Sequence, residues 1–299
     1  MKFTTFILVL FSVINIGCGN QKRTLMNLDI QGHRGCRGLF PENTLPAFNH
    51  ALELGVTTLE MDLAITGDHL VIVSHEPFFN HEISLDPEGN IIPKEEQLEH
   101  NIYKMPYERV KQYDVGLKAH PRFPSQKKLA CYKPLLSSVF DLTKEYCRQH
   151  NKPIPYFNIE IKSKEGFDGV YHPPVDTFVN LALQVISEYD FDDKVTIQSF
   201  DTRALNYLNK TYPNIRSVYL IENKEHIEKN LQKLNFTPDI YSPDYNLIDS
   251  NLVENCKQNG MKLIPWTVND TNSMKKLIHI GVDGIITDYP DLLIDLIKK

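Results

Sequence analysis

Two acidic residues, Glu60 and Asp62, stand two positions apart in an apolar run that is typical of a buried β-strand. Residues two apart on a strand point to the same face, so the two carboxylates are expected side by side. Unpaired carboxylates in a protein interior are very costly, and a bound cation or a basic partner would offset that cost. Oxygen ligands suit Ca²⁺ or Mg²⁺ rather than zinc. In the opposite orientation the carboxylates would lie in solvent, and Leu59, Met61 and Leu63 would fill the interior.

A second strand-like run has the same alternation. Asn158, Glu160 and Lys162 share one face, and the isoleucines between them share the other. Glu160 could supply a third oxygen to the cation, and Lys162 could neutralise a phosphate. The same face would then serve both a metal ion and an anion.

Two histidines stand at the ends of further strand-like runs. His33 ends the first run and is followed by Arg34, and His75 closes another run. Histidine exchanges protons near neutral pH, and arginine is a planar, permanently charged partner for anions. Later runs also end in polar residues or a tryptophan, at Gln198, Trp266 and Asp288. Such residues at successive strand ends are what a site at the mouth of a barrel needs.

From residue 28 onward, short β-rich runs alternate with longer helical patterns. The strands are expected at 28–33, 57–65, 70–75, 156–161, 194–200, 215–221, 240–245, 262–268 and 284–287. The helices are expected at 44–54, 136–150, 174–189, 201–212, 224–234, 249–259, 271–280 and 290–298. With 70–75 as a hairpin partner of the preceding strand, eight strand–helix units remain, which predicts an α/β fold of the (β/α)₈ TIM-barrel type. A doubly wound sheet is the alternative, but no Gly-x-Gly-x-x-Gly follows the first strand.

The stretch from about 77 to 134 breaks this alternation. It is rich in Pro, Lys, Glu and Asn and has little helical or strand period. We interpret it as an insertion on the second strand–helix connection, at the carboxyl end of the barrel where TIM-barrel active sites lie. A loop of this length is usually functional or a small subdomain, and a loose decoration is the alternative.

The amino terminus has the pattern of a secretory signal. Residues 1–17 hold one lysine and an apolar stretch too short to be a typical membrane span, and they precede Cys18. Gly17-Cys18 resembles a bacterial lipobox, although Asn15 stands where Leu is usual. We therefore predict a lipoprotein signal peptide at 1–17, lipidation at Cys18, a linker at 18–27 and the barrel domain at 28–299. Ordinary cleavage nearby and an uncleaved anchor are the alternatives.

The composition is that of a globular protein. The 299 residues are 41% hydrophobic and 23% charged, which argues against a disordered chain. The net charge is −6 with no polybasic run, which argues against nucleic acid as a partner. Apart from Cys18 there are four cysteines without metal-binding spacing, and buried thiols are favoured over disulfides, whose pairing stays open.

Taken in order, the motifs are similar to those of glycerophosphodiester phosphodiesterases. In the first half these are Gly32-His33-Arg34-Gly35, Pro41-Glu42-Asn43-Thr44, Glu60-x-Asp62, Thr66-x-Asp68 and Val73-Ser74-His75. In the second half they are Ile159-Glu160-Ile161-Lys162, Gln198-Ser199-Phe200, Trp266-Thr267-Val268-Asn269 and the run 281–290. The resemblance runs from about residue 29 to 297. Two positions depart from it, because Glu76 replaces a usual Asp and Cys36 replaces a usual Ala or Gly.

The resemblance implies hydrolysis of small glycerophosphodiesters to glycerol 3-phosphate and an alcohol, through a cyclic phosphate. It implies one divalent cation, Ca²⁺ or Mg²⁺, held by Glu60, Asp62 and Glu160. His33 and His75 would be the general acid and base, in either order. Arg34 and Lys162 would face the phosphate. Glu42, Gln198 and Trp266 would line the site, and Glu42 would either complete the metal shell or orient Arg34.

The resemblance is to bacterial, lipoprotein-type members, so the expected location is the cell envelope, on the periplasmic side and anchored to a membrane through lipid. Two other functions remain open. One is a phospholipase D-like activity on lysophospholipids, and the other is a lipoprotein that binds phosphodiesters without turnover.

Overall fold

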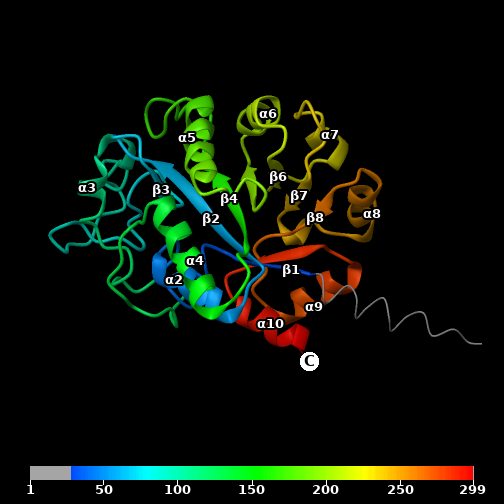
Figure 1. Cartoon of the computed structure of the whole chain (residues 1–299), viewed down its shortest axis with the longest axis horizontal. Coiled ribbons are helices and arrows are strands. Elements are labelled where there is room, and N and C mark those ends of the chain that lie inside the picture. The colour runs from blue at the N-terminus through cyan, green and yellow to red at the C-terminus, as the bar shows by residue number, and fades with distance from the viewer. Residues whose placement is uncertain (1–27, 299) are drawn as a thin grey trace, which may run out of the picture.

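The computed structural model describes residues 28–298 as a barrel of parallel strands (Figure 1). The predicted signal peptide 1–17, Cys18 and the linker up to residue 27 lie outside the described residues. The strands are β1 (Asp29–Gly32), β2 (Thr58–Ile65), β3 (Val71–Val73), β4 (Tyr156–Ile161), β5 (Val195–Ser199), β6 (Arg216–Ile221), β7 (Ile240–Pro243), β8 (Lys262–Leu263) and β9 (Gly284–Thr287).

Eight strands are parallel neighbours in the order β8-β7-β6-β5-β4-β2-β1-β9, and β3 pairs antiparallel with β2 as a hairpin partner. Backbone bonds also join the two ends of this order. The amide of Asp283 donates to the Leu263 carbonyl at 2.9 Å, and the amide of Ile286 donates to the Pro265 carbonyl at 3.0 Å. The predicted (β/α)₈ barrel is confirmed.

Helices surround the strands on all sides in Figure 1. They are α2 (Leu45–Leu54), α3 (Tyr107–Val110), α4 (Leu136–His150), α5 (Val175–Glu188), α6 (Thr202–Thr211), α7 (Ile227–Leu231), α8 (Ser250–Gln258), α9 (Thr271–Ile280) and α10 (Pro290–Lys298). Two 3₁₀ turns, η1 (Ile102–Lys104) and η2 (Tyr245–Leu247), complete the described elements.

Two elements are much shorter than the sequence predicts. β8 ends before Pro265, which has no amide hydrogen to continue a strand ladder. α7 begins only at Ile227, because the Asn223 side chain accepts from the Glu225 amide at 2.9 Å and holds the preceding residues in a turn.

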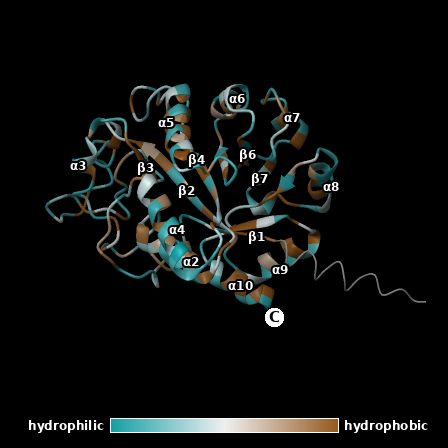
Figure 2. Cartoon of the chain, in the orientation of Figure 1, coloured by the Kyte–Doolittle hydropathy of each residue, from teal (hydrophilic) through white to brown (hydrophobic). Residues whose placement is uncertain are grey.

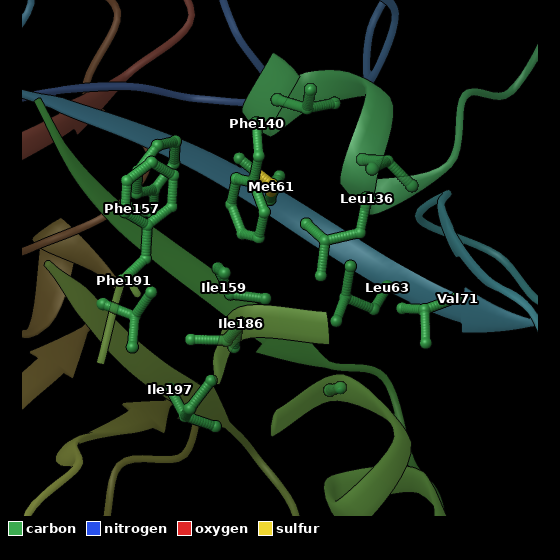
Figure 3. Packing of buried hydrophobic residues seen from close by; sticks show 14 of the residues in the cluster. Met61, Leu63, Val71, Leu136, Phe140, Phe157, Ile159, Ile186, Phe191 and Ile197 are labelled. Carbon is green, nitrogen blue, oxygen red and sulfur yellow. The ribbon is translucent and has the colours of Figure 1, made fainter. Parts of the chain in front are cut away.

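The main core lies between the strands and the helices around them. Figure 3 shows Met61 and Ile159, from β2 and β4, packed with Leu136 and Phe140 of α4 and Ile186 of α5. Figure 2 shows hydrophobic and hydrophilic residues alternating along α5, as expected for a helix with one buried face. Because the apolar residues of β2 and β4 face outward to the helices, the alternate polar residues face the barrel interior.

The barrel interior has a polar half and an apolar half. β6 to β9 and the adjoining segment contribute a buried apolar cluster of Val218, Ile240, Ile264 and Ile286. β1, β2, β4 and β5 instead contribute buried amide and carboxylate side chains. The buried amide and carboxylate side chains of these strands therefore lie on one side of the barrel interior.

The segment between β3 and α4 has a packed core of its own. Phe79 is fully buried, and its ring stacks on Tyr113 with centroids 3.7 Å apart and an angle of 8° between the planes. Gln126 donates to the Arg37 carbonyl at 2.7 Å, and the Lys127 amide donates to the Leu39 carbonyl at 2.9 Å. These bonds join the segment to the loop that follows β1, so it is part of the wall around the carboxyl end of the barrel.

The four cysteines within residues 28–298 are buried free thiols. In the same part of the chain, no helix is both long and apolar enough to cross a membrane.

Replacing Phe79 with alanine is expected to cost about 3–5 kcal/mol of unfolding free energy, since the change leaves a cavity in the core of this segment. Urea unfolding of the full chain measures the loss. Ile91→Ala is the control, because Ile91 is 67% exposed in the same segment and its loss should cost about 0.5 kcal/mol or less. Equal stabilities of the two variants would show that the segment is not held by its core.

Candidate active site

The loop after β1 brings Arg34 to the carboxyl end of β2. Arg34 and Gly35 both have positive φ, 51° and 86°, and together they form a tight turn. A side-chain carbon on Gly35 would lie 2.7 Å from the Ala47 carbonyl carbon, so only glycine fits. The turn directs the Arg34 amide to Glu60 Oε2 at 2.8 Å.

Glu60, Asp62 and Glu160 form an acidic triad inside the barrel. Each is buried, and one oxygen from each lies within 4.8 Å of the others. Asp62 Oδ2 accepts from Asn43 Nδ2 at 2.8 Å, whereas Asp62 Oδ1 is buried without a hydrogen-bond partner among residues 28–298. An unpartnered buried carboxylate oxygen is costly, and three converging carboxylates are a suitable donor set for a hard divalent cation.

Burial and mutual repulsion disturb the ionisation of the triad. Burial and the Asp62 charge raise the pKa of Glu60 well above its usual range, and burial raises the pKa of Glu160 to about 7. Burial alone would also raise the pKa of Asp62, but Arg34 and other cations hold it well below the usual range. Groups perturbed in this way are typical of functional sites.

Two positively charged side chains, Arg34 and Lys162, contact the triad. Arg34 Nε lies 3.1 Å from Asp62 Oδ2, and its Nη1 donates to Glu42 Oε1 at 2.6 Å. Lys162 Nζ lies 3.0 Å from Glu160 Oε1. Glu42 thus contacts Arg34 rather than the triad, and it fixes the guanidinium beside Asp62.

His33 is held by a carboxylate from the end of the chain. Its Nδ1 lies 2.7 Å from Asp288 Oδ1, and its Nε2 lies 3.9 Å from Glu60 Oε2. Asp288 also accepts two hydrogen bonds from Arg37, at 2.8 and 3.0 Å. Because a carboxylate only accepts, Nδ1 carries the proton and Nε2 is left free to accept one. Burial lowers the pKa of His33 to about 4, which keeps the imidazole neutral at pH 7.

A carboxylate also holds Nδ1 of His75, on the other side of the triad, but here Nε2 has a partner too. Its Nδ1 lies 2.7 Å from Glu76 Oε1, and its Nε2 lies 3.0 Å from Lys162 Nζ. Burial, Arg34 and Lys162 lower its pKa. Glu76, which stands where the similar family usually has Asp, therefore still contacts Nδ1 of His75.

The remaining predicted residues line the same end of the barrel. Gln198 donates to Glu60 Oε1 at 2.7 Å. Trp266 lies further out, where its indole donates to the Ser242 carbonyl and its ring meets Phe200 edge-on with centroids 5.5 Å apart. Cys18 lies outside the described residues.

Several residues that sequence reasoning gave no role also belong to the site. Asp288 holds His33, and Arg37 in turn holds Asp288; the position of Asp288 at the end of the last strand was the available signal. His120 lies 3.6 Å from Glu42, and Lys133 donates to Ser74 Oγ at 2.8 Å. These two come from the segment without periodicity, where no pattern pointed to them.

A parallel barrel with an acidic triad, two histidines and two cations at the carboxyl ends of its strands has the architecture of a TIM-barrel enzyme. The model of the glycerophosphoryl diester phosphodiesterase family matches residues 33–292. A glycerophosphodiester phosphodiesterase from Caldanaerobacter subterraneus subsp. tengcongensis is 33% identical over 270 residues, which are 89% of this chain and 96% of that protein.

Solved structures agree with this match. A protein from Silicibacter pomeroyi, assigned as a glycerophosphoryl diester phosphodiesterase, superposes with a TM-score of 0.81 at 26% identity, over 91% of this chain and 93% of that one. An Oleispira antarctica phosphodiesterase in complex with its product sn-glycerol-3-phosphate shares the fold, with a TM-score of 0.72 at 22% identity, over 92% and 98% of the chains. The chain belongs to the glycerophosphoryl diester phosphodiesterase family, and it is a phosphoric diester hydrolase.

Asp288→Asn is expected to lower kcat by roughly 10²–10⁴-fold, because an amide no longer enforces the His33 tautomer in which Nε2 is free. Steady-state hydrolysis of glycerophosphocholine measures the effect. Asp270→Asn is the control, since Asp270 caps helix α9 outside the site and asparagine caps equally well. A kcat within threefold of wild type for Asp288→Asn would remove Asp288 from the site.

Proposed function

We propose that the protein hydrolyses glycerophosphodiesters to glycerol 3-phosphate and an alcohol in a reaction that depends on a divalent cation. The observation that carries the proposal is the buried Asp62 oxygen, which has no hydrogen-bond partner among residues 28–298. It lies in an acidic triad between two histidines that carboxylates hold. Membership of the family and the product held by the Oleispira relative support the substrate class.

The acidic triad would hold one Ca²⁺ or Mg²⁺ ion through carboxylate oxygens. When bound, the cation would act as a Lewis acid and neutralise charge on the phosphate oxygens. Lys162 supports the same task, since its ammonium group adjoins Glu160 and Asp62, and the charge of these carboxylates raises its pKa despite the opposing effect of burial. Arg34, fixed by Glu42, adds a second positive charge on the other side of Asp62.

The two histidines would move the protons. A neutral His, with Nδ1 held and Nε2 free, is suited to take the proton from the glycerol hydroxyl next to the phosphate as that oxygen attacks phosphorus. The other His would have to enter the reaction protonated on both nitrogens, a form that its carboxylate partner and the anionic substrate would favour. It would then donate the Nε2 proton to the alcohol oxygen as the bond of that oxygen to phosphorus breaks. Water would then open the cyclic phosphate, with the two roles exchanged. Carboxylates hold Nδ1 of both His33 and His75, whereas Nε2 is free in His33 and contacts Lys162 Nζ at 3.0 Å in His75.

We also propose that the mature protein is a lipoprotein of the bacterial cell envelope, attached on the periplasmic side through Cys18. The support is the apolar run 6–16 followed by Gly17-Cys18.

Metal removal tests the reaction. The 18–299 protein should release glycerol 3-phosphate from glycerophosphocholine, lose this activity in EDTA, and regain it when Ca²⁺ or Mg²⁺ is added. Glycerophosphoethanolamine serves as a second substrate. Release that persists in EDTA would refute the metal dependence. No release with either cation from either substrate would instead favour lysophospholipids or a binding protein without turnover.

His33→Ala and His75→Ala should each lower kcat by about 10²–10⁴-fold, because each change removes one proton-transfer group. The fold should persist, as checked by circular dichroism. His279→Ala, on the exposed end of α9, is the matched control and should keep full activity. Near wild-type turnover in either site variant would show that the acid–base assignment is wrong.

Cys18→Ser should release the protein from membranes, because serine offers no thiol for lipid attachment. Fractionation of expressing cells and the mass of the mature amino terminus measure this. A serine variant that stays membrane-bound, or an unmodified Cys18, would contradict the proposed anchor.

A further inference from the structure

Three buried amide side chains connect the acidic triad to the amino-terminal end of the barrel. Gln31, Asn158 and Gln198 are each 1% exposed, and they come from β1, β4 and β5. Asn158 Nδ2 donates to Gln31 Oε1 at 2.8 Å and to Gln198 Oε1 at 2.9 Å. We call this set the amide chain.

A carboxylate stands at each end of the amide chain. At one end Gln31 Nε2 donates to Asp29 Oδ2 at 2.8 Å, and at the other end Gln198 Nε2 donates to Glu60 Oε1 at 2.7 Å. An ionised carboxylate, which Glu60 would be with the cation bound, only accepts hydrogen bonds, so the amino group of each glutamine points to the carboxylate beside it. Both glutamine oxygens must then face the middle of the chain.

Only a double donor can occupy the middle position. The two hydrogens of the Asn158 amino group satisfy both glutamine oxygens, and the Asn158 oxygen accepts from Thr196 Oγ1 at 2.9 Å. A hydroxyl has one hydrogen, and a carboxylate has none. Asparagine at this position therefore determines which atom Gln198 presents to Glu60.

The surroundings keep the amide chain in this state. The other half of the barrel interior is the apolar cluster of β6 to β9, so the amide chain has few competing hydrogen-bond partners there. In a buried network, breaking one bond leaves a polar group unsatisfied, which costs about 1–3 kcal/mol. The Gln198 amide is consequently held against flipping.

Glu60 receives one donor on each oxygen. Gln198 holds Oε1, and the backbone amide of Arg34 holds Oε2. The plane of the carboxylate is thereby fixed relative to Asp62 and Glu160. Partners of metal ligands typically change metal affinity by 10–100-fold when they are removed.

We propose that Asn158 and Gln198 are positioning residues that orient Glu60 for cation binding, with Asn158 setting the direction of the hydrogen bonds. This inference rests on the proposed cation site. It concerns cation affinity, which is measured without substrate or turnover.

Isothermal titration calorimetry of metal-stripped 18–299 protein with Ca²⁺ or Mg²⁺ alone tests the proposal. Asn158→Asp keeps the shape but places an acceptor between two glutamine oxygens, so it should raise the Kd by about 10–100-fold. Gln198→Met keeps the length but removes the donor to Glu60, and it should raise the Kd similarly. It provides the test if Asn158→Asp does not fold.

Asn230→Asp is the matched control. Asn230 is another fully buried asparagine whose amide donates, at 3.0 Å to Tyr241 Oη, but it lies in α7 away from the triad. It should lose stability and keep the wild-type Kd within about twofold. Equal Kd values for wild type, Asn158→Asp and Gln198→Met would overturn the inference while leaving the cation site intact. A wild-type protein that binds neither cation would overturn the proposed cation site, and this inference with it.

Discussion

The burial of three carboxylates in one small volume constrains the rest of the site. Two unit charges about 4 Å apart repel each other by roughly 4 kcal/mol at an effective dielectric constant of about 20. Arg34 and Lys162 contact the acidic triad, but Arg34 shares its charge with Glu42. The triad is thus short of positive charge, and burial raises the pKa of Glu60 and Glu160 accordingly. A divalent cation would resolve this imbalance, which is why the triad has the character of a binding site rather than of a structural ion-pair cluster.

Each group that would perform chemistry is held by a second side chain, which for His33 and Glu60 comes from a distant part of the chain. Asp288, at the end of the last strand, holds His33 next to the first strand. Glu76 holds His75, and the amide chain holds Glu60. Closing the sheet into a barrel makes the contact of Asp288 with His33 possible, because it brings β9 beside β1. The fold therefore supplies orientation as well as proximity, and orientation is what proton transfer and cation binding require.

Local patterns in the sequence were sufficient for the barrel and the triad. The two-residue period placed Glu60 and Asp62 on one face of their strand but left open whether that face lies inside the barrel. The structure decides this, because Met61 and Ile159 pack against the helices and the carboxylates face inward. Local patterns do not predict contacts between distant segments, so the sequence analysis did not identify Asp288 as the partner of His33. The segment between β3 and α4 has no period, and its packed core and the contacts of its buried polar residues with the site depend on tertiary structure alone. The predicted strand 262–268 is longer than β8, because the prediction did not take into account that Pro265 interrupts a strand.

The cation site is the central claim, and direct binding tests it best. Metal-stripped 18–299 protein and an Asp62→Asn variant would each be titrated with Ca²⁺ and Mg²⁺ by calorimetry. Asparagine keeps the shape of Asp62 but removes its charge, including that of the oxygen that lacks a partner. The account predicts one cation per wild-type chain and a loss of affinity of at least tenfold in the variant. Equal binding by both proteins would place the cation elsewhere, and no binding by the wild type would contradict the account.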